Sequence, residues 1–212
     1  MEVIYVDNHI LLVNKKAGLP TQTSEHSAEC LHELAKQWVK KEFNKPGAVF
    51  LEPIHRLDKP VSGLVLFART SKALSRLQEE MREGRIKKTY YAKVEGKLPD
   101  QAGTLKHSLL HDDHRARVVS QGGKLAILHY KVSERGVVEI QLETGRYHQI
   151  RCQFSAIGCP IVGDKKYGSR TAYREDAIAL HHGKLEFIHP VTKELVSFQS
   201  KNLSWIGAII HI

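Results

Sequence analysis

The chain contains few residues that could build a disulfide framework or a metal centre. Its three cysteines, an odd number in 212 residues, include no Cys-x-x-Cys pair. This pattern argues against a disulfide scaffold and fits a reducing compartment. The thirteen histidines form no His-Glu-x-x-His motif and no Cys/His cluster at zinc-ligand spacing. We therefore expect neither a metal nor another cofactor.

Long apolar runs are also missing. No apolar segment reaches the roughly 18 residues that a membrane-spanning helix needs, and the N-terminus lacks the basic and apolar regions of a secretory signal. We therefore expect a soluble cytoplasmic protein with no membrane partner. A length of 212 residues allows one sizeable core. Because there is no internal repeat, low-complexity tract or linker, we expect a single domain over residues 1–212.

Acidic residues are the minority among the charged side chains. There are 23 Asp and Glu against 32 Lys and Arg, which gives a formal net charge of +9. Such an excess suggests a polyanionic partner, but generic basicity explains it as well. Charge alone does not identify RNA as the partner.

The spacing of apolar residues predicts the main helices and strands. A 3.6-residue period predicts a helix around 31–39 and a second helix over about 71–82, with Thr70 or Ser71 as its N-cap. Alternation and short apolar runs predict the strands, which cover residues 3–6, 10–13, 64–68, 86–94, 104–110, 117–119, 124–132, 137–142, 179–190 and 195–198.

The region around Asp58 combines a rigid turn with a buried strand. It reads P-I-H-R-L-D-K-P-V-S-G-L-V-L-F-A-R-T over residues 53–70, and Pro60 biases the residue before it away from helix. We place Asp58 in a loop that feeds the strand. A carboxylate there, with Arg56 close in sequence, is typical of an acid kept ionised in a partly desolvated pocket. An Asx-turn or a structural Arg–Asp pair is the alternative interpretation.

A second informative segment is the basic strand around Tyr90. Apolar and polar residues alternate there, which places Tyr90 and Lys88 on one face and Lys87 on the other. An inward aromatic ring beside a basic edge is suited to stacking a flipped base. An ordinary core tyrosine is the alternative interpretation.

A strand followed by a helix is predicted around the sequence E-T-G-R-Y-H-Q-I-R. We expect Tyr147, His148 and Arg151 to lie in the N-terminal half of this helix, which ends at Gly158. A helix N-terminus with Arg146 and Arg151 is suited to a phosphate or a carboxylate. A solvated basic helix face is the alternative.

Five motifs occur in a fixed order along the chain. They are H-R-L-D-x-x-x-S-G-L at 55–64, K-x-Y-x-A-x-V-x-G at 88–96, G-R-x-H-Q-I-R at 145–151, P-I-V-G-D-x-x-Y-G at 160–168 and L-H-x-x-x-L-x-F-x-H-P at 180–190. Together they resemble the catalytic domain of the RluA-type pseudouridine synthases. The resemblance implies an α+β fold with a largely antiparallel, bisected central sheet flanked by helices. It also leads us to expect no separate N-terminal RNA-binding domain.

The resemblance implies roles for individual residues. Asp58 matches the family's essential aspartate, and Arg56 matches the arginine that helps to displace the target base. Tyr90 matches the tyrosine that stacks against the base, and Arg151 the arginine that pairs with the aspartate. Leu180 matches an apolar residue that lines the pocket. Further substrate contacts are expected from His55, Arg146, His148, Lys87, Lys88, Lys165 and Lys166.

The implied activity is the isomerisation of uridine to pseudouridine in structured RNA, either tRNA or large-subunit ribosomal RNA. We expect a monomer by default. One alternative is an RNA-binding or assembly module without catalysis, which would not need Asp58 or Arg151. Another is a hydrolytic nucleobase glycosylase, which would need a second carboxylate, with Asp164 as the nearby candidate. Four positions depart from the family pattern and bear on substrate identity, namely Val61, Tyr147, Gln153 and Cys159.

Overall fold

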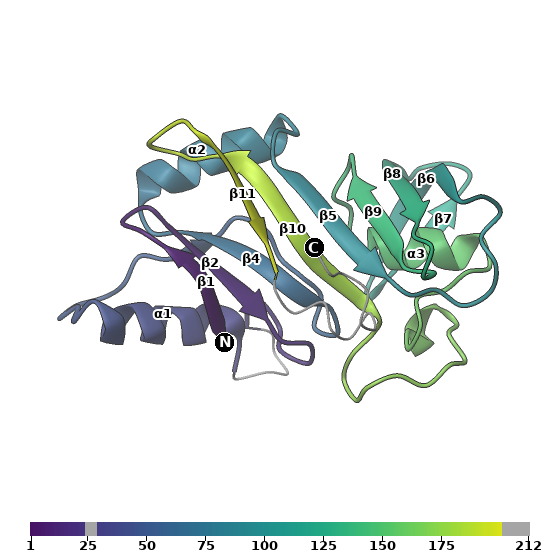
Figure 1. Ribbon diagram of the computed structural model, residues 1–212, viewed down its shortest axis with the longest axis horizontal. Helices are drawn as coiled ribbons and strands as arrows, with labels where there is room; N and C mark the ends of the chain where they lie inside the picture. Colours follow the sequence, from purple (N-terminus) through teal and green to yellow (C-terminus); the bar gives the residue numbers. More distant parts are fainter. Residues whose placement is uncertain (24–28, 201–212) are drawn as a thin grey trace. The chain divides into compact units, whose positions relative to one another are not determined.

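The computed structural model describes residues 1–23 and 29–200. These residues fall into two compact units, one formed by Met1–Ile86 with Lys184–Ser200 and the other by Lys87–Gly183 (Figure 1). In the part of the chain that is described, three α-helices accompany a largely antiparallel sheet, which confirms the predicted α+β class. That the two units make one catalytic domain stays a prediction.

The first unit contains an antiparallel sheet. Strands β1 (Glu2–Val6), β2 (Ile10–Lys15) and β4 (Ser62–Ala68) pair in that order, and the short β3 (Glu52–Pro53) also pairs with β4. Strand β10 (Leu180–Ile188) enters this unit at Lys184 and forms a hairpin with β11 (Leu195–Gln199). The pairing of β1 with β2 confirms the strand pair that the sequence predicts at the N-terminus.

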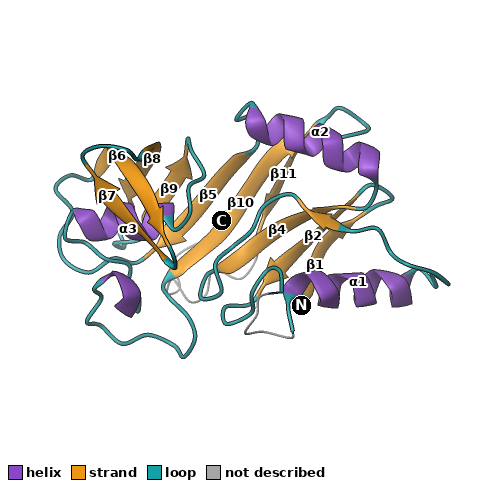
Figure 2. Cartoon of the chain, turned by 180° about the vertical axis from the view of Figure 1, so that it is seen from behind, coloured by secondary structure: helices purple, strands orange, loops and turns teal. Residues whose placement is uncertain are grey.

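Strand β4 is buried on both faces because a helix covers each of them (Figure 2). Leu64 and Leu66 share a core cluster with Leu77 of helix α2 (Ser71–Arg82). Phe67 points to the opposite face, since side chains alternate along a strand. There its ring stacks on His32 of helix α1 (Leu31–Glu42) at 6.0 Å. The strand that follows Asp58 is thus fixed on both sides.

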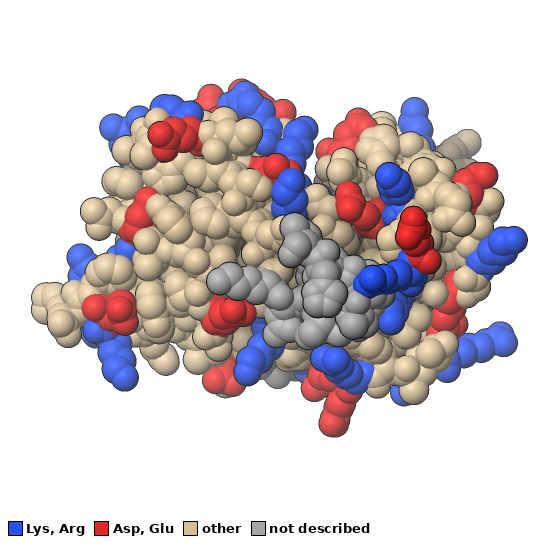
Figure 3. Space-filling model, in the orientation of Figure 1, with Lys and Arg blue, Asp and Glu red and all other residues tan. Residues whose placement is uncertain are grey.

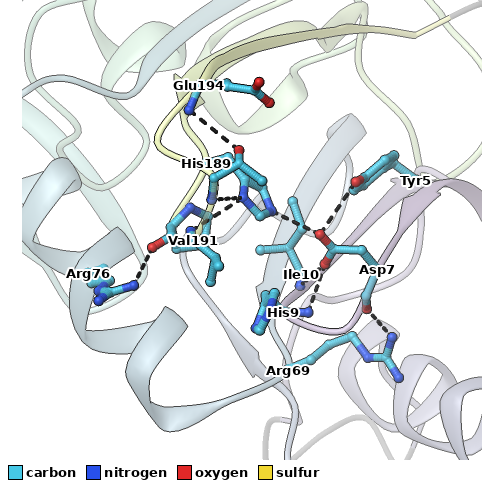
Figure 4. A network of polar contacts seen from close by, with 11 residues as sticks. Tyr5, Asp7, His9, Ile10, Arg69, Arg76, His189, Val191 and Glu194 are labelled. Carbon is cyan, nitrogen blue, oxygen red and sulfur yellow. Dashed lines mark hydrogen bonds and ion pairs between the residues drawn. The ribbon is translucent and has the colours of Figure 1, made fainter.

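A polar network joins the ends of the strands in this unit (Figure 4). Asp7, in the β1–β2 turn, accepts hydrogen bonds from the backbone N–H groups of His9 and Ile10, each at 2.7 Å. Its second carboxylate oxygen lies 2.9 Å from Nε2 of His189, at the end of β10. The Arg69 guanidinium donates to the Asp7 carbonyl oxygen. The network connects the β1–β2 turn to residues that follow β4 and β10.

The second unit contains an antiparallel sheet and one α-helix. Strands β5 (Lys87–Ala92), β9 (Val138–Leu142), β8 (Lys124–Val132), β6 (Ala102–Asp112) and β7 (Arg115–Val119) lie in that order. Helix α3 (Gln149–Ala156) and the short 3-10 helix η1 (Lys165–Tyr167) follow these strands in sequence. Within residues 1–23 and 29–200, no helix is long and apolar enough to cross a membrane.

The start of helix α3 differs from the prediction. Tyr147 and His148 precede the helix, because His148 is its N-cap and adopts a left-handed backbone conformation with φ of 51°. A non-glycine residue in this conformation is uncommon and needs support from its surroundings. The tertiary contacts of the His148 ring, described below, provide that support.

Candidate active site

Asp58 lies in the loop between β3 and β4, as the sequence predicts. Its carbonyl oxygen accepts a hydrogen bond of 3.0 Å from the N–H of Val61, which closes a turn over Pro60. Arg56 is exposed and Asp58 is half-buried, while the intervening Leu57 is buried. The acid therefore stands at the edge of the core rather than in open solvent.

The backbone just before Asp58 is held by Thr21. The Thr21 hydroxyl donates to the carbonyl oxygen of Leu57 at 2.9 Å and accepts from the N–H of Leu57 at 3.1 Å. Both residues are buried, at 3% and 6% exposure. Leaving a buried backbone group unpaired costs about 1–3 kcal/mol, so this single hydroxyl fixes the chain next to the acid.

The backbone just after Asp58 is held by Lys15. This lysine is 1% exposed, and its Nζ donates to the carbonyl oxygens of Leu19 at 2.7 Å, Lys16 at 3.1 Å and Lys59 at 3.3 Å. The N–H of Gly18 donates to the same Lys59 carbonyl oxygen at 2.9 Å. The end of β2 and the loop after it therefore hold the backbone on both sides of Asp58.

Burial has a large effect on the charge of Lys15. It lowers the pKa of the ammonium group from 10.5 to about 7, although the nearby Asp58 carboxylate raises it. Removing water disfavours a charged amine unless an anion compensates. Sequence reasoning missed Lys15 and Thr21, and the only signal was their position in a polar segment that interrupts the strand pattern.

The other motif residue in the first unit, His55, makes a structural contact. Its Nε2 accepts a hydrogen bond of 3.3 Å from the N–H of Leu66 in β4. The neighbouring Ile54 N–H donates to the Leu66 carbonyl oxygen at 2.9 Å. His55 thus anchors the loop that carries Asp58 to the strand that follows it.

Tyr90 lies in β5 with its side chain buried to 6% exposure. Its ring stacks on the imidazole of His182 with centroids 4.6 Å apart and an angle of 22°. Leu180, two residues before His182, is 3% exposed at the start of β10. Tyr90 is therefore held by a second ring, which fixes the plane in which it can offer a stacking face.

Arg151 is held by a buried carboxylate. Its Nε and Nη2 donate to the two oxygens of Asp164 at 2.6 and 2.9 Å, and the side chains are 6% and 1% exposed. Such a bidentate pair is geometrically specific as well as strong. Asp164, considered above as a water-activating carboxylate, is thus the partner that orients Arg151, a role that the sequence analysis did not assign.

His148 is neutral and held in one orientation. Burial, followed by the positive charges of Arg151 and Lys166, lowers its pKa to about 3. Its Nδ1 lies 2.9 Å from the Tyr167 hydroxyl, which accepts from the N–H of Ala116 at 2.8 Å. A tyrosine hydroxyl can both donate and accept, so this contact with Nδ1 fixes the orientation of the imidazole ring.

Gln149 fixes the loop that precedes helix α3. Its Oε1 accepts from the Thr144 hydroxyl at 2.8 Å and from the N–H of Arg146 at 2.9 Å. Its Nε2 donates to the carbonyl oxygen of Ile127 at 3.0 Å. The loop is therefore braced against β8, although Gln149 was not among the predicted site residues.

The predicted phosphate contacts differ in exposure. Lys87, Arg146, Lys165 and Lys166 are exposed, whereas Lys88 is half-buried and burial lowers the pKa of its ammonium group. Figure 3 shows Lys and Arg interspersed with Asp and Glu on the face in view, rather than gathered in one band. Among the described residues, no group of three or more His, Cys, Asp or Glu could hold a metal ion.

The predicted site residues divide between the two units. His55, Arg56 and Asp58 belong to the first unit, and the others belong to the second. In the first unit the structure gathers Lys15, Thr21 and the Asp58 turn. In the second it gathers His148 and Arg151, at the start of helix α3, with Asp164, which lies in the loop after that helix.

Comparison with known proteins identifies the class of protein that this fold and these residues define. Residues 9–156 match the family described as RNA pseudouridylate synthase. The chain belongs to this family, and it is an RNA pseudouridine synthase, an enzyme that acts on RNA.

Individual relatives define the subgroup. The chain is 33% identical over 209 residues to the dual-specificity RNA pseudouridine synthase RluA of Pasteurella multocida, covering 94% of this chain and 92% of that one. It is 35% identical over 209 residues to the uncharacterized RNA pseudouridine synthase YhcT of Bacillus subtilis, covering 92% and 67%. It is thus an RluA-type pseudouridine synthase, as the five motifs predict.

Solved structures agree with this fold. The human RNA pseudouridylate synthase domain containing 4 superposes with a TM-score of 0.78 at 23% identity, covering 94% of this chain and 88% of that one. At this level of identity the match concerns the fold alone. It confirms the predicted pseudouridine synthase fold.

Proposed function

We propose that the chain isomerises a uridine in structured RNA, with Asp58 as the catalytic carboxylate and the target base extruded from its stack. The observation that supports the proposal is that hydrogen bonds hold the backbone on both sides of Asp58. Thr21 holds Leu57 before the acid, and Lys15 with Gly18 holds Lys59 after it. A reacting carboxylate needs this fixed position, since misplacement by about 1 Å can cost a hundredfold in rate.

The reaction has few requirements beyond one ionised carboxylate in a water-poor pocket. The N1–C1′ bond breaks, the uracil turns while it stays bound, C5 joins C1′, and the C5 hydrogen leaves as a proton. Ordinary glycoside hydrolysis needs a second group to activate water, but here no water is consumed. Asp58 has three routes open to it: addition to C1′, addition to uracil C6, or deprotonation of C2′ to give a glycal.

In this proposal the other residues hold the carboxylate and the base. Arg151 is assigned the pairing with the Asp58 carboxylate that the family resemblance implies. Its bidentate pair with Asp164 fixes the plane of the guanidinium. Tyr90, braced by His182, stacks on the detached uracil, and Arg56 helps to displace the base.

The free-energy cost of extruding the target base bears on the choice of RNA substrate. Extruding a base costs a few kcal/mol and costs least in loops, which favours tRNA or large-subunit ribosomal RNA. The ribosomal large subunit pseudouridine synthase C of Escherichia coli is 34% identical over 215 residues, covering 93% of this chain and 65% of that one. Its name supports ribosomal RNA as one of the two targets.

The decisive experiment is tritium release from RNA labelled at uracil C5. Wild type should release tritium from total tRNA or from ribosomal RNA, and Asp58→Asn should release none while its RNA affinity stays within about twofold. Asp176→Asn, at an exposed loop carboxylate, serves as the control that keeps full release. Release by Asp58→Asn equal to wild type would refute Asp58 as the catalytic group.

The same samples separate the two rival functions. A binding module would bind RNA but release no tritium from either substrate. A hydrolytic glycosylase would release free uracil, detected by chromatography, and leave abasic RNA. The pairing of Asp164 with Arg151 argues against the hydrolytic glycosylase. Its candidate water-activating carboxylate, Asp164, is buried and already bound to Arg151.

A further inference from the structure

An aromatic stack of three rings reaches the surface of the second unit. It consists of His111, Tyr147 and His148, and we call it the ring stack. The Tyr147 ring lies 3.9 Å from the His148 ring at 18°, and 4.1 Å from the His111 ring at 40°. Tyr147 is one of the positions at which the sequence departs from the family pattern.

The geometry fixes the order of the rings. Two rings on the same face of Tyr147 would overlap if both centroids lay about 4 Å from its own, so His148 and His111 lie on opposite faces. His148 is buried at 8% exposure, Tyr147 is 38% exposed, and His111 is exposed. The stack therefore runs outward from the core and ends at the imidazole of His111.

The inner end of the stack is rigid. The His148 ring meets Tyr167 edge-on at 5.6 Å and is hydrogen-bonded to the Tyr167 hydroxyl. The guanidinium groups of Arg115 and Arg151 each lie 5.0 Å from the centroid of the same Tyr167 ring. The inner ring of the stack is thus held by Tyr167, which also contacts the Arg151 guanidinium.

Cationic side chains lie around the stack. Lys166 donates from Nζ to the carbonyl oxygen of His114, three residues after His111, at 2.9 Å. Arg146 directly precedes Tyr147 in sequence and is exposed. An aromatic surface bordered by Lys and Arg is the combination that binds single-stranded nucleic acid, because every base has a face to stack and a phosphate beside it.

We propose that the ring stack is a docking platform for an unpaired base of the substrate RNA, distinct from the target uridine, and that this base stacks on His111. The proposal rests on the proposed function and extends it, since Tyr90 is assigned to the target base. Its consequence is a preference for RNA in which a second unpaired base is available.

The test measures binding to a labelled hairpin RNA whose loop contains only uridine, by fluorescence anisotropy with the full chain. A set of matched hairpins carries an abasic nucleotide at one loop position at a time. The proteins are wild type, His111→Ala, His111→Phe and, as a matched control, His114→Ala, an exposed histidine outside the ring stack. Tyr147→Ala provides a second way to remove the platform.

The proposal makes three joint expectations. His111→Ala weakens binding by about fivefold or more, the low end for stacking of one base on an aromatic side chain, whereas His111→Phe and His114→Ala stay near wild type. One abasic position abolishes the difference between wild type and His111→Ala. The slope of log Kd against log salt is unchanged in His111→Ala, because no phosphate contact is lost.

Opposite results overturn the proposal. Binding of His111→Ala within about twofold of wild type would do so, as would a loss that every abasic hairpin retains, because the rings would then only stabilise the loop. If His111→Ala fails to fold, the same comparison with Tyr147→Ala decides. Failure of the proposed function is separate, since tritium release by Asp58→Asn leaves the binding result unaffected.

Discussion

Replacing the buried Lys15 by methionine gives a quantitative test of how the Asp58 turn is held. Methionine has a similar length and no charge, so it fills the space but cannot donate to the three carbonyl oxygens. The variant therefore removes a titrating group together with its hydrogen bonds. The hydrogen bonds change stability at every pH, whereas the titrating group changes its pH dependence.

The magnitude follows from the shift in pKa. One unit corresponds to about 1.4 kcal/mol, so a change from 10.5 to about 7 represents about 5 kcal/mol between folded and unfolded protein. The folded pKa lies below the unfolded value, so between these two values the unfolded chain binds the proton and the folded one does not. The free energy of unfolding contributed by Lys15 therefore rises with pH across this window.

Urea unfolding of wild type and Lys15→Met, followed by the fluorescence of Trp38 in α1, measures this contribution. The difference in unfolding free energy, wild type minus variant, should increase by about 1.4 kcal/mol per pH unit between pH 7.5 and 9.5. All other titrating groups are shared by the two proteins and cancel. Lys16→Met, at the exposed neighbouring lysine, is the control and should show no such slope.

A difference that is independent of pH would refute the reasoning. It would mean that the Lys15 amine keeps its proton over this range and that the three carbonyl oxygens and Asp58 offset the cost of burying it. A slope of the opposite sign would mean that the folded pKa exceeds 10.5 and that the Asp58 carboxylate outweighs the burial of the amine.

Three further predictions concern individual contacts. Asp164→Ala removes the buried carboxylate that pairs with the Arg151 guanidinium, and we expect about 3–5 kcal/mol lower stability in urea unfolding; a loss below about 1 kcal/mol would contradict the pairing. Tyr90→Ala should reduce kcat/KM for tritium release by about 5- to 150-fold through lost stacking, while Tyr90→Phe stays near wild type; equal losses in both variants would indicate a role for the hydroxyl instead. Thr70→Ala removes the N-cap hydrogen bond to Ala73 and should cost about 1 kcal/mol, whereas Thr70→Ser should retain most of the stability.

Local sequence signals predicted the regular elements well. Helix α2 occupies Ser71–Arg82 with Thr70 as its cap, as predicted, because apolar spacing and a capping hydroxyl act within a few residues. Strand β8 also has the predicted bounds. Strand β6 is longer than predicted, since Ala102 and Gly103 pair with β8 at one end and His111 and Asp112 pair with β7 at the other.

For the site residues, too, the prediction succeeded where the signal is local and failed where it is not. The sequence located Asp58 in its loop and Tyr90 on a strand, because a proline turn and an alternating pattern are both local. It placed Tyr147 and His148 inside helix α3, and that prediction was wrong. The left-handed His148 backbone depends on Tyr167, which lies 19 residues further along the chain.

The sequence by itself determined the family and most of the elements, and it predicts which carboxylate is the catalytic one, because those signals lie in short motifs. Only the tertiary structure decided what holds the acid. Lys15 reaches the carbonyl oxygen of Lys59, 44 residues away, and Asp164 reaches Arg151 across a loop. Burial then converts an ordinary lysine into one with a pKa of about 7. Desolvation depends on which atoms surround a group in the folded chain, and no local pattern records it.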